Sequence, residues 1–402
     1  MTTAPPQLHV SEGLEDFVRL LLSEPALQTR LAEAVSPNDF VADSQAIAAG
    51  HGLPLDEATL RGALRPDPVG LGRFGPAPVT LDCWPGEGWL PARSVLTGGP
   101  PAFDWALFGT RRLTESFYED SVRRTATSPL NLLLRTRTGL DALIAGAAGA
   151  DTIPLTGLIF HMSRCGSTLL AQMLGAPTHH AVASEPEALD AILQWAQLPG
   201  VGEDHAIAAV QAFVAAISRR RGSQALRFFI KLDAWHILSL PLLRAALPDV
   251  PWVYLFRDPI EVLVSHRRQP GMHTVAGTMP EEIFGISDGC TLAPIEYAAR
   301  TLKAIGEAAL EGLTQGGGMA LSYSEIAASV PTTIARHFGF TPSAADRESM
   351  RLVANRDAKA PDRPFAADSQ SKRAAADDTI RAAAASLDSV HAQLVAAAAG
   401  RG

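Results

Sequence analysis

A short glycine-containing turn near the middle of the chain separates an apolar run from a helical pattern, in the stretch from Gly157 to Leu170 (GLIFHMSRCGSTLL). In an α/β protein, the N–H groups of such a turn and of the first helical residues point at one place, where the helix dipole favours an anion. Ser167 and Thr168 add hydroxyl donors, and Arg164 adds a fixed positive charge suited to an oxyanion. We therefore predict a phosphate-binding loop here.

The predicted loop lacks parts that a nucleoside triphosphatase needs. A phosphate loop of the Walker type ends in Gly-Lys-[Ser/Thr], whereas Gly166 is followed directly by Ser167, and the cation comes earlier, at Arg164. The apolar strand expected at 252–256 is followed by Arg257 and not by an aspartate that could hold Mg²⁺. These residues are poorly equipped for ATP or GTP hydrolysis but suit an anion held without a metal.

A second polar pair follows the strand expected at 252–256. Arg257 leaves the end of that strand, and Ser265 lies eight residues further on, about two turns into the next helix. Both can face the carboxyl edge of the sheet, where open α/β folds bind ligands. The pair could hold a second phosphate. An ordinary strand–helix junction with a salt-bridged arginine explains the motif equally well.

An alternation of strands and helices positions both motifs. The expected strands are 155–160, 181–183, 226–230, 252–256 and 319–322, with helices such as 166–176 and 206–220 between them. This alternation predicts an α/β fold with a P-loop-like parallel sheet sandwiched by helices. Loop 270–294 is rich in Gly, Met and Pro, as is typical of a lid or substrate loop. An Ala-rich helix is expected over about 370–399.

The first 150 residues have a different pattern. Residues 1–66 are expected to form an all-helical module, in which Ser36 caps a helix that stops at Gly50-His-Gly52. Residues 67–103 are rich in Pro and Gly and are expected to be irregular, whereas 104–146 have a helical pattern again. The predicted division is 1–66 helical module, 67–150 irregular and helical extension, and 151–402 α/β domain.

Within the extension, two Arg-Arg pairs could reach an anionic ligand. They are Arg111-Arg112 and Arg123-Arg124, and Glu115, Glu119 and Asp120 lie close to them in the sequence. A solvated helix face, on which these acids pair with the arginines, is the commoner arrangement.

Composition limits the class of protein. A chain of 402 residues with 47 % hydrophobic content can build a substantial core and more than one domain, and a net charge of −8 argues against a general nucleic-acid binder. Three distant cysteines, Cys83, Cys165 and Cys290, make no disulfide framework and suggest a reducing compartment. The N-terminal sequence lacks a signal-peptide pattern, and no apolar run approaches the roughly 18 residues that span a bilayer. We expect a cytoplasmic protein.

Together, the motifs resemble those of the sulfotransferase family, which transfers sulfuryl groups from 3′-phosphoadenosine 5′-phosphosulfate (PAPS). Ser163–Leu170 is similar to the 5′-phosphosulfate loop of that family, and Arg257 and Ser265 match its 3′-phosphate arginine and serine in type and spacing. The segment 321–326 (LSYSEI) resembles its Tyr-Glu-Asp-Leu region, so the resemblance extends over about residues 153–342.

The resemblance implies a metal-independent sulfotransferase with a sulfotransferase-like sheet. It implies that PAPS is bound by Arg164, Cys165, Gly166, Ser167, Thr168, Leu169, Arg257, Ser265 and Lys359. The basic pair Lys372-Arg373 would also close over the nucleotide, with solvated charge as the alternative. The implied acceptor is a hydroxyl (or amine) of a small molecule or a peptide.

The resemblance also implies which residues take part in transfer. The family often carries Lys-x-His before the 3′-phosphate arginine. Here Lys231 remains, but Asp233 stands where histidine is common. Members that modify protein tyrosines use a glutamate about twenty residues after the loop arginine, and Glu185 lies twenty-one after Arg164. We expect Glu185 as the base, Asp233 as runner-up and His236 third, with Arg164 and Lys231 stabilising charge on the transferred group. A helix N-terminal acid is the alternative for Glu185.

One loop residue departs from the family pattern. Cys165 replaces the usual serine, and a thiol beside Arg164 in a first helical turn can have a lowered pKa and be prone to oxidation. A packing role is the commoner one for such a cysteine.

Two weaker resemblances concern the N-terminal part. About fifty residues of 1–66 resemble the helical leader domain of nitrogen-fixation-associated peptide precursors, which implies a peptide partner. A helical bundle that packs on the main domain is the alternative. Residues 67–146 are similar to the N-terminal part of bacterial relatives labelled aspartyl β-hydroxylase, but the chain has no His-x-Asp or His-x-Glu pair for a facial iron triad.

Two other functional classes remain open at this point. A P-loop kinase-like phosphotransferase would depend on magnesium and ATP. A non-catalytic nucleotide- or peptide-binding protein would retain the ligand-binding residues without turnover.

Overall fold

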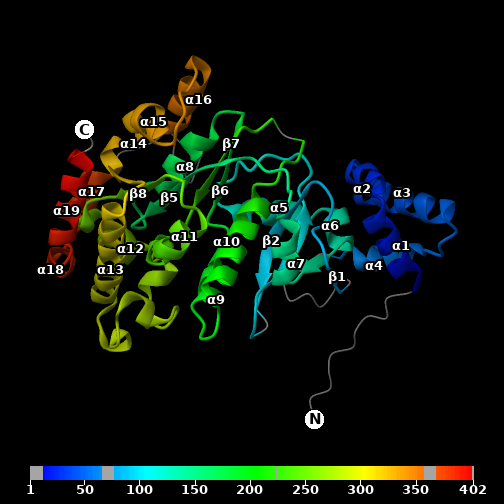
Figure 1. Cartoon of the computed structure of the whole chain (residues 1–402), viewed down its shortest axis with the longest axis horizontal. Helices are drawn as coiled ribbons and strands as arrows, with labels where there is room; N and C mark the ends of the chain where they lie inside the picture. The colour runs from blue at the N-terminus through cyan, green and yellow to red at the C-terminus, as the bar shows by residue number, and fades with distance from the viewer. Residues whose placement is uncertain (1–11, 66–76, 97, 223, 357–367, 401–402) are drawn as a thin grey trace, which may run out of the picture.

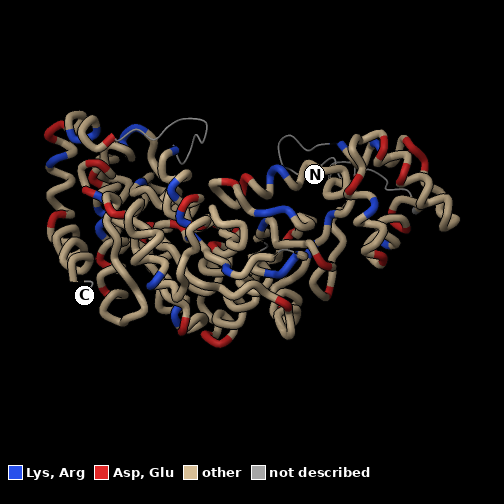
Figure 2. Tube along the Cα trace, turned by 90° about the horizontal axis from the view of Figure 1, so that it is seen from above, with Lys and Arg blue, Asp and Glu red and all other residues tan. Residues whose placement is uncertain are grey.

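The computed structural model describes residues 12–65, 77–96, 98–222, 224–356 and 368–400 of the chain. Helices from the N-terminal part lie at one end of the molecule, a small β-sheet follows, and a larger α/β part carries the C-terminal helices at the opposite end (Figure 1). Basic and acidic residues are intermixed along most of the chain (Figure 2). Among the described helices, none combines the length and apolarity needed to cross a bilayer.

The described residues before position 66 are helical, as predicted. The four helices are α1 (Glu12–Ser23), α2 (Pro25–Ala32), α3 (Pro37–Gly50) and α4 (Glu57–Ala63). Ser36 caps α3 by accepting a 3.1 Å hydrogen bond from the Asp39 amide, and the Asp39 carboxylate accepts one from the Ser36 amide. The helix ends at Gly50, where the sequence predicted its end.

The extension contains a β-sheet that was not predicted. Its strands are β1 (Val79–Leu81), β2 (Trp89–Val95), β3 (Ala102–Leu107) and β4 (Thr136–Thr138), in the order β1-β4-β3-β2. The predicted irregular segment and the predicted helical pattern are therefore wrong at these strands. Two of them have only three residues, and β2 contains Pro91 next to a break in register, so their alternation is too short to recognise in the sequence.

The described part of the extension also contains three helices, and its small sheet contacts the N-terminal helical module. They are α5 (Tyr118–Ala126), α6 (Pro129–Leu133) and α7 (Leu140–Gly146). Trp89 is fully buried, and its Nε1 donates a 3.0 Å hydrogen bond to Oε1 of Gln28 in α2. This bond joins the helical module to the small sheet.

The larger part is an α/β fold with a five-stranded parallel sheet, as predicted. Its strands are β5 (Leu155–His161), β6 (His180–Ser184), β7 (Arg227–Lys231), β8 (Trp252–Phe256) and β9 (Gly318–Ser322), in the order β6-β7-β5-β8-β9. The chain leaves β5 towards β6 and β7 and then crosses to β8 on the other side. The carboxyl end of β5 is therefore the point at which α/β folds of this kind bind ligands.

Helices flank this sheet, with α8 above it and α11 to α13 below it in Figure 1. They are α8 (Ser167–Gly175), α9 (Glu187–Ala196), α10 (Glu203–Ile217), α11 (Leu240–Ala246), α12 (Pro259–Arg268), α13 (Pro294–Thr314), α14 (Ile326–Ser329), α15 (Ala335–His337) and α16 (Ala344–Ala354). Short 3₁₀ turns lie at η1 (Ala234–Ser239), η2 (Met272–Thr274), η3 (Glu281–Phe284), η4 (Gly289–Thr291) and η5 (Tyr323–Glu325), and a π-helical turn at η6 (Val330–Ile334).

The single C-terminal helix that the sequence predicted is instead three helices. They are α17 (Ser369–Ala374), α18 (Asp378–Ala385) and α19 (Asp388–Ala399). Asp377 caps α18 by accepting a hydrogen bond from the Ile380 amide, so a new helix begins inside the Ala-rich run.

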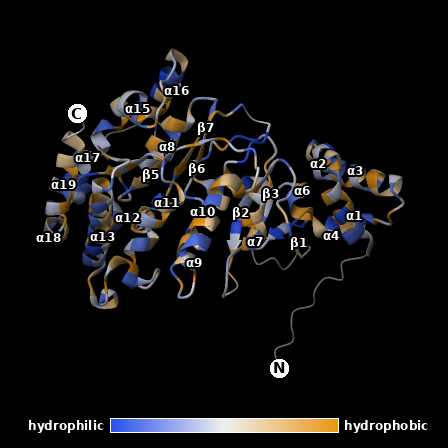
Figure 3. Cartoon of the chain, in the orientation of Figure 1, coloured by the Kyte–Doolittle hydropathy of each residue, from blue (hydrophilic) through white to orange (hydrophobic). Residues whose placement is uncertain are grey.

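Hydrophobic residues line the strands at the centre of the α/β part, whereas hydrophilic residues lie on outer helix faces (Figure 3). All five residues of β8 are buried. Gly157 of β5 is buried as well, and a Cβ added there would lie 2.3 Å from the ring of the buried Phe338. The backbone of the central strand thus packs directly against an aromatic ring.

Substituting Gly157→Ala should lower the free energy of unfolding by about 2 kcal/mol, because the Phe338 ring must move in a filled core. Gly62→Ala is the control, since nothing lies within 4 Å of the added Cβ in helix α4. That change should raise stability by roughly 0.5 to 1 kcal/mol through helix propensity. Urea unfolding of both variants measures this, and equal effects would contradict the close contact.

Candidate functional site

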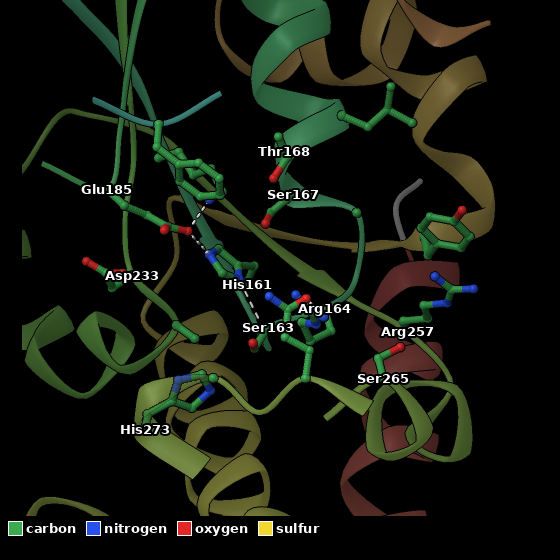
Figure 4. Close-up of a pocket in the computed structure, with 18 of the residues that line it drawn as sticks. His161, Ser163, Arg164, Ser167, Thr168, Glu185, Asp233, Arg257, Ser265 and His273 are labelled. Carbon is green, nitrogen blue, oxygen red and sulfur yellow. Dashed lines mark hydrogen bonds and ion pairs between the residues drawn. The ribbon is translucent and has the colours of Figure 1, made fainter. Parts of the chain in front are cut away.

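A pocket of about 760 Å³ opens at the carboxyl ends of β5, β6, β7 and β8 (Figure 4). Its wall includes most of the residues that the sequence predicted: Arg164, Gly166, Ser167, Thr168, Leu169, Glu185, Lys231, Asp233, Arg257, Ser265 and Lys372. Cys165 and His236 are not among the wall residues. Lys359 lies outside the described residues. The two predicted motifs therefore belong to one site.

The glycine loop turns sharply between β5 and α8. Ser163, Arg164 and Gly166 have φ of 73°, 51° and 90°, in the left-handed region that favours glycine. A Cβ on Gly166 would lie 2.6 Å from Cδ2 of Tyr323, so a larger residue would not fit. Helix α8 begins at the pocket wall with Ser167, and the N–H groups of a first helical turn have no intrahelical acceptor. This geometry suits an anion.

A buried charge cluster ends the neighbouring strands. Lys231, with 1 % of its side chain exposed, forms an ion pair with Glu185, whose Oε1 also lies 3.4 Å from Nε2 of His161. Glu185 has φ of 53°, and its amide donates a 2.6 Å hydrogen bond to the Lys231 carbonyl. Burial opposes ionisation of Glu185, but the charge of Lys231 and the contact with His161 outweigh it and lower the pKa of the carboxyl. Glu185 is therefore a carboxylate at neutral pH.

His161 was missed by the sequence reasoning. It ends β5 directly before the glycine loop, and its Nδ1 accepts a 3.0 Å hydrogen bond from the Ser163 amide. Burial, together with the charge of Lys231, lowers the pKa of its ring below the usual value. A polar residue that directly follows the apolar run Leu158–Phe160 and precedes the loop was the available signal.

Asp233, a second carboxyl group at this end of the pocket, behaves differently. Burial raises the pKa of Asp233 to about 7, and the nearby charge of Glu185 acts in the same direction. His236, the third candidate base, is 1 % exposed and its Nε2 lies 2.8 Å from Oδ1 of Asp190. Its ring pairs with Asp190, lies 3.9 Å from Oδ2 of Asp233 and does not line the pocket.

The Arg257 end of the pocket is densely ion-paired. Arg257 donates from Nε to Glu261, at 2.6 Å, and from Nη2 to Asp368, also at 2.6 Å. Its guanidinium carbon lies 3.9 Å from the centre of the Tyr323 ring. Ser265 lies beside it on the pocket wall and donates to the Glu261 carbonyl at 2.8 Å. Arg257 is thus salt-bridged, as the ordinary strand–helix junction predicts, and it also faces the pocket, as binding of a second phosphate would require.

Cys165 has a packing role. Its side chain is fully buried, and its Sγ donates to the Leu255 carbonyl at 3.2 Å. Burial raises the pKa of the thiol to about 12. The packing role that the sequence favoured is therefore the observed one, and the alternative of a lowered pKa is not, because the loop turns this side chain away from the pocket and against β8.

The end of the pocket near Lys231 has apolar and aromatic walls that the sequence did not predict. Phe117, which precedes α5 in the extension, places its ring centre 5.2 Å from Nζ of Lys231. Trp235 lies 5.4 Å, centre to centre, from the ring of His273. Burial lowers the pKa of His273 to about 3, so its ring is neutral. His273 and Met272 both belong to loop 270–294, so this loop forms part of the pocket wall.

The two Arg-Arg pairs lie elsewhere. Arg111 and Arg124 pair with Glu115, Arg123 pairs with Glu119 and Asp120, and Arg112 donates to the carbonyls of Gly175 and Pro177. None of the four arginines lines the pocket described above. Arg123 and Arg124 thus lie on an ion-paired face of α5, as the commoner arrangement predicts, whereas Arg111 and Arg112 lie before that helix, and Arg112 contacts carbonyls instead of the acids.

Three solved structures of sulfotransferase domains are similar to this chain. The "Sulfotransferase Domain from the Curacin Biosynthetic Pathway" is 13 % identical, with 52 % of this chain and 80 % of that chain covered and a TM-score of 0.33. The "Sulfotransferase Domain from the Synechococcus PCC 7002 Olefin Synthase" is 17 % identical, with 61 % of this chain and 96 % of that chain covered and a TM-score of 0.36. The sulfotransferase from Alicyclobacillus acidocaldarius is 13 % identical, with the same two shares covered and a TM-score of 0.37. The sequence matches no protein-family model and no curated protein. At these values the function must be argued from the site itself.

The burial of Cys165 predicts a count of reactive thiols. Cys83 and Cys290 are exposed, whereas Cys165 is buried. In the folded protein a thiol reagent such as 5,5′-dithiobis(2-nitrobenzoate) should modify two of the three cysteines rapidly, and the third only in denaturant. Rapid modification of Cys165, located by peptide mass spectrometry, would contradict this.

Proposed function

We propose that the chain is a sulfotransferase that moves a sulfuryl group from PAPS to a hydroxyl (or amine) acceptor without a metal. One observation carries the proposal: a single pocket has the glycine loop in its middle and Arg257 with Lys372 on one side. The carboxyl groups of Glu185 and Asp233 lie on the other side (Figure 4). Such a pocket fits a donor with one anionic group at its centre and a second at one end. The acceptor would then meet the carboxyl groups at the opposite end.

The loop residues fit the donor. The close approach of Gly166 to Tyr323 and the start of α8 at the pocket support binding of the 5′-phosphosulfate by Gly166, Ser167 and Thr168. Arg257, Ser265 and Lys372 would bind the 3′-phosphate. PAPS would supply the sulfuryl group, with adenosine 3′,5′-bisphosphate leaving as the new S–O bond forms.

Asp233 is better suited than Glu185 to take the acceptor proton. A base works best when its pKa lies near the working pH, and the pKa of Asp233 is about 7, whereas that of Glu185 is lowered. Glu185 is also held by Lys231. We therefore assign Asp233 as the base and Glu185 as the group that positions Lys231. The Lys231 ammonium and Arg164 would stabilise the charge that develops during transfer.

A kinase-like phosphotransferase has less support. No lysine follows Gly166, and β8 is followed by Arg257. A non-catalytic binding protein would use the same nucleotide-binding residues and would differ from the proposed enzyme only in lacking sulfuryl transfer.

Calorimetry with adenosine 3′,5′-bisphosphate and with ATP–Mg²⁺ tests the proposal directly. The bisphosphate should bind and ATP–Mg²⁺ should not. Arg257→Ala should weaken the bisphosphate about ten- to hundredfold, the size of a lost charged hydrogen bond, and should weaken adenosine 5′-phosphosulfate little. Arg267→Ala is the control, because Arg267 pairs with Asp377 outside the pocket. Binding of ATP–Mg²⁺ alone would refute the proposal.

The assignment of Asp233 predicts a pH profile. The base must be deprotonated, so the rate of bisphosphate release from PAPS, with a panel of phenol, sugar and peptide hydroxyls, should rise with pH, pass half of its maximum at about 7 and level off at higher pH. Asp233→Asn should lower the rate about a hundredfold or more and remove this rise. Its affinity for the bisphosphate should stay near that of the wild type.

Glu185→Gln provides the matched comparison. It removes a negative charge that raises the pKa of Asp233, so the rising limb should remain but move to lower pH. If Glu185→Gln abolishes the limb while Asp233→Asn keeps it, Glu185 is the base.

A further inference from the structure

The cations at the Arg257 end already hold an anion that belongs to the chain. Asp368 places Oδ1 2.6 Å from Nη2 of Arg257 and Oδ2 2.7 Å from Nζ of Lys372. The Ser369 hydroxyl accepts a further hydrogen bond from the same Arg257 nitrogen, at 3.2 Å. The carboxylate thus bridges two cations, as a bound phosphate would.

Helix capping does not account for this position of Asp368. The residue stands at the N-cap of α17, but its carboxylate makes no capping hydrogen bond. It contributes to the pocket wall instead, together with Lys372. Burial opposes its ionisation, but hydrogen bonds from Lys372 and Arg257 outweigh burial and lower the pKa of Asp368. The group is therefore an anion at neutral pH.

The ion-paired cluster is balanced without a ligand. Among the described residues, three cations face three carboxylates in it: Arg257, Lys372 and Arg373 against Asp258, Glu261 and Asp368. A phosphate that approaches Arg257 and Lys372 would meet the Asp368 carboxylate already bound to them, and the two anions would repel each other. Removal of Asp368 leaves one positive charge uncompensated where Arg257 and Lys372 meet.

We propose that Asp368 is an internal competitor for the 3′-phosphate of the donor. Asp368 holds helix α17 against Arg257, and a 3′-phosphate displaces it by taking over Arg257 and Lys372. A dianionic phosphate wins this exchange because it binds both cations more strongly than one carboxylate does. A nucleotide without a 3′-phosphate leaves Asp368 in place. Asp368 therefore lowers the affinity of the pocket for the 3′-phosphate and leaves that for nucleotides without this group unchanged, an inference that rests on the proposed function.

Asp368→Asn tests the competition by calorimetry. Asparagine keeps the size of the side chain and suits an N-cap position, but it lacks the charge. The variant should bind adenosine 3′,5′-bisphosphate about fivefold more tightly than the wild type, the size of a half-exposed ion pair. Its affinity for adenosine 5′-phosphosulfate should not change.

Asp377→Asn is the matched control. Asp377, like Asp368, stands at the N-cap of a C-terminal helix and pairs with an arginine, with Oδ2 2.6 Å from Nη1 of Arg267, but it does not line the pocket. This variant should leave both affinities unchanged.

Hydrogen exchange of α17 gives a readout that does not depend on ligand affinity. Asp368→Asn alone should speed exchange of the α17 amides, and the bisphosphate should do the same in the wild type. If the wild type binds the bisphosphate and Asp368→Asn binds it equally or more weakly, Asp368 orients Arg257 and the competition is refuted, while the proposed function stands. If neither protein binds the bisphosphate, the proposed function fails first.

Discussion

The left-handed backbone of the turn between β5 and α8 is the constraint on which the site depends. Among the described residues, three that are not glycine have positive φ, and Ser163, Arg164 and Glu185 all line the pocket. Such conformations cost roughly 1 kcal/mol or more each and persist only where neighbours hold them. The Ser163 amide is held by His161, and Cys165 is held by the carbonyl of Leu255. Cys165 thus fastens the turn to β8.

Buried charge at the sheet edge decides how the two carboxyl groups differ. An ammonium as buried as that of Lys231 would be costly without a partner, and the left-handed Glu185 supplies the partner. Asp233 lies close by without such a strong pair, and burial keeps its pKa high. Two carboxyl groups with pKa values pushed apart are the arrangement in which one acts as a base and the other as a fixed charge.

The extension (67–150) is hydrogen-bonded to the α/β part at several places. Arg221 donates from Nη1 to the carbonyls of Gly109 and Arg111, both at 2.8 Å, and the Ser94 amide donates to Glu187 of α9 at 2.9 Å. These contacts hold the extension in place, so that Phe117 reaches the ammonium of Lys231. The surface that an acceptor would meet is therefore built partly by the extension.

The sequence by itself determined the parallel sheet and the glycine loop, because buried strands and a strand–turn–helix junction leave strong local patterns. Four predicted strands begin and end within one residue of the observed ones, and 252–256 coincides with β8. It also indicated that Arg257 and Ser265 can face the carboxyl edge of the sheet, and the structure brings them to the loop because β8 pairs with β5. Only the tertiary structure decided the small sheet, the burial of Cys165, and the contacts of His161 and Phe117 with the charge cluster. It also decided that Asp368, more than a hundred residues after Arg257, would neutralise that arginine. These features depend on which side chains from distant parts of the chain pack together, and the local spacing of residues does not predict such contacts.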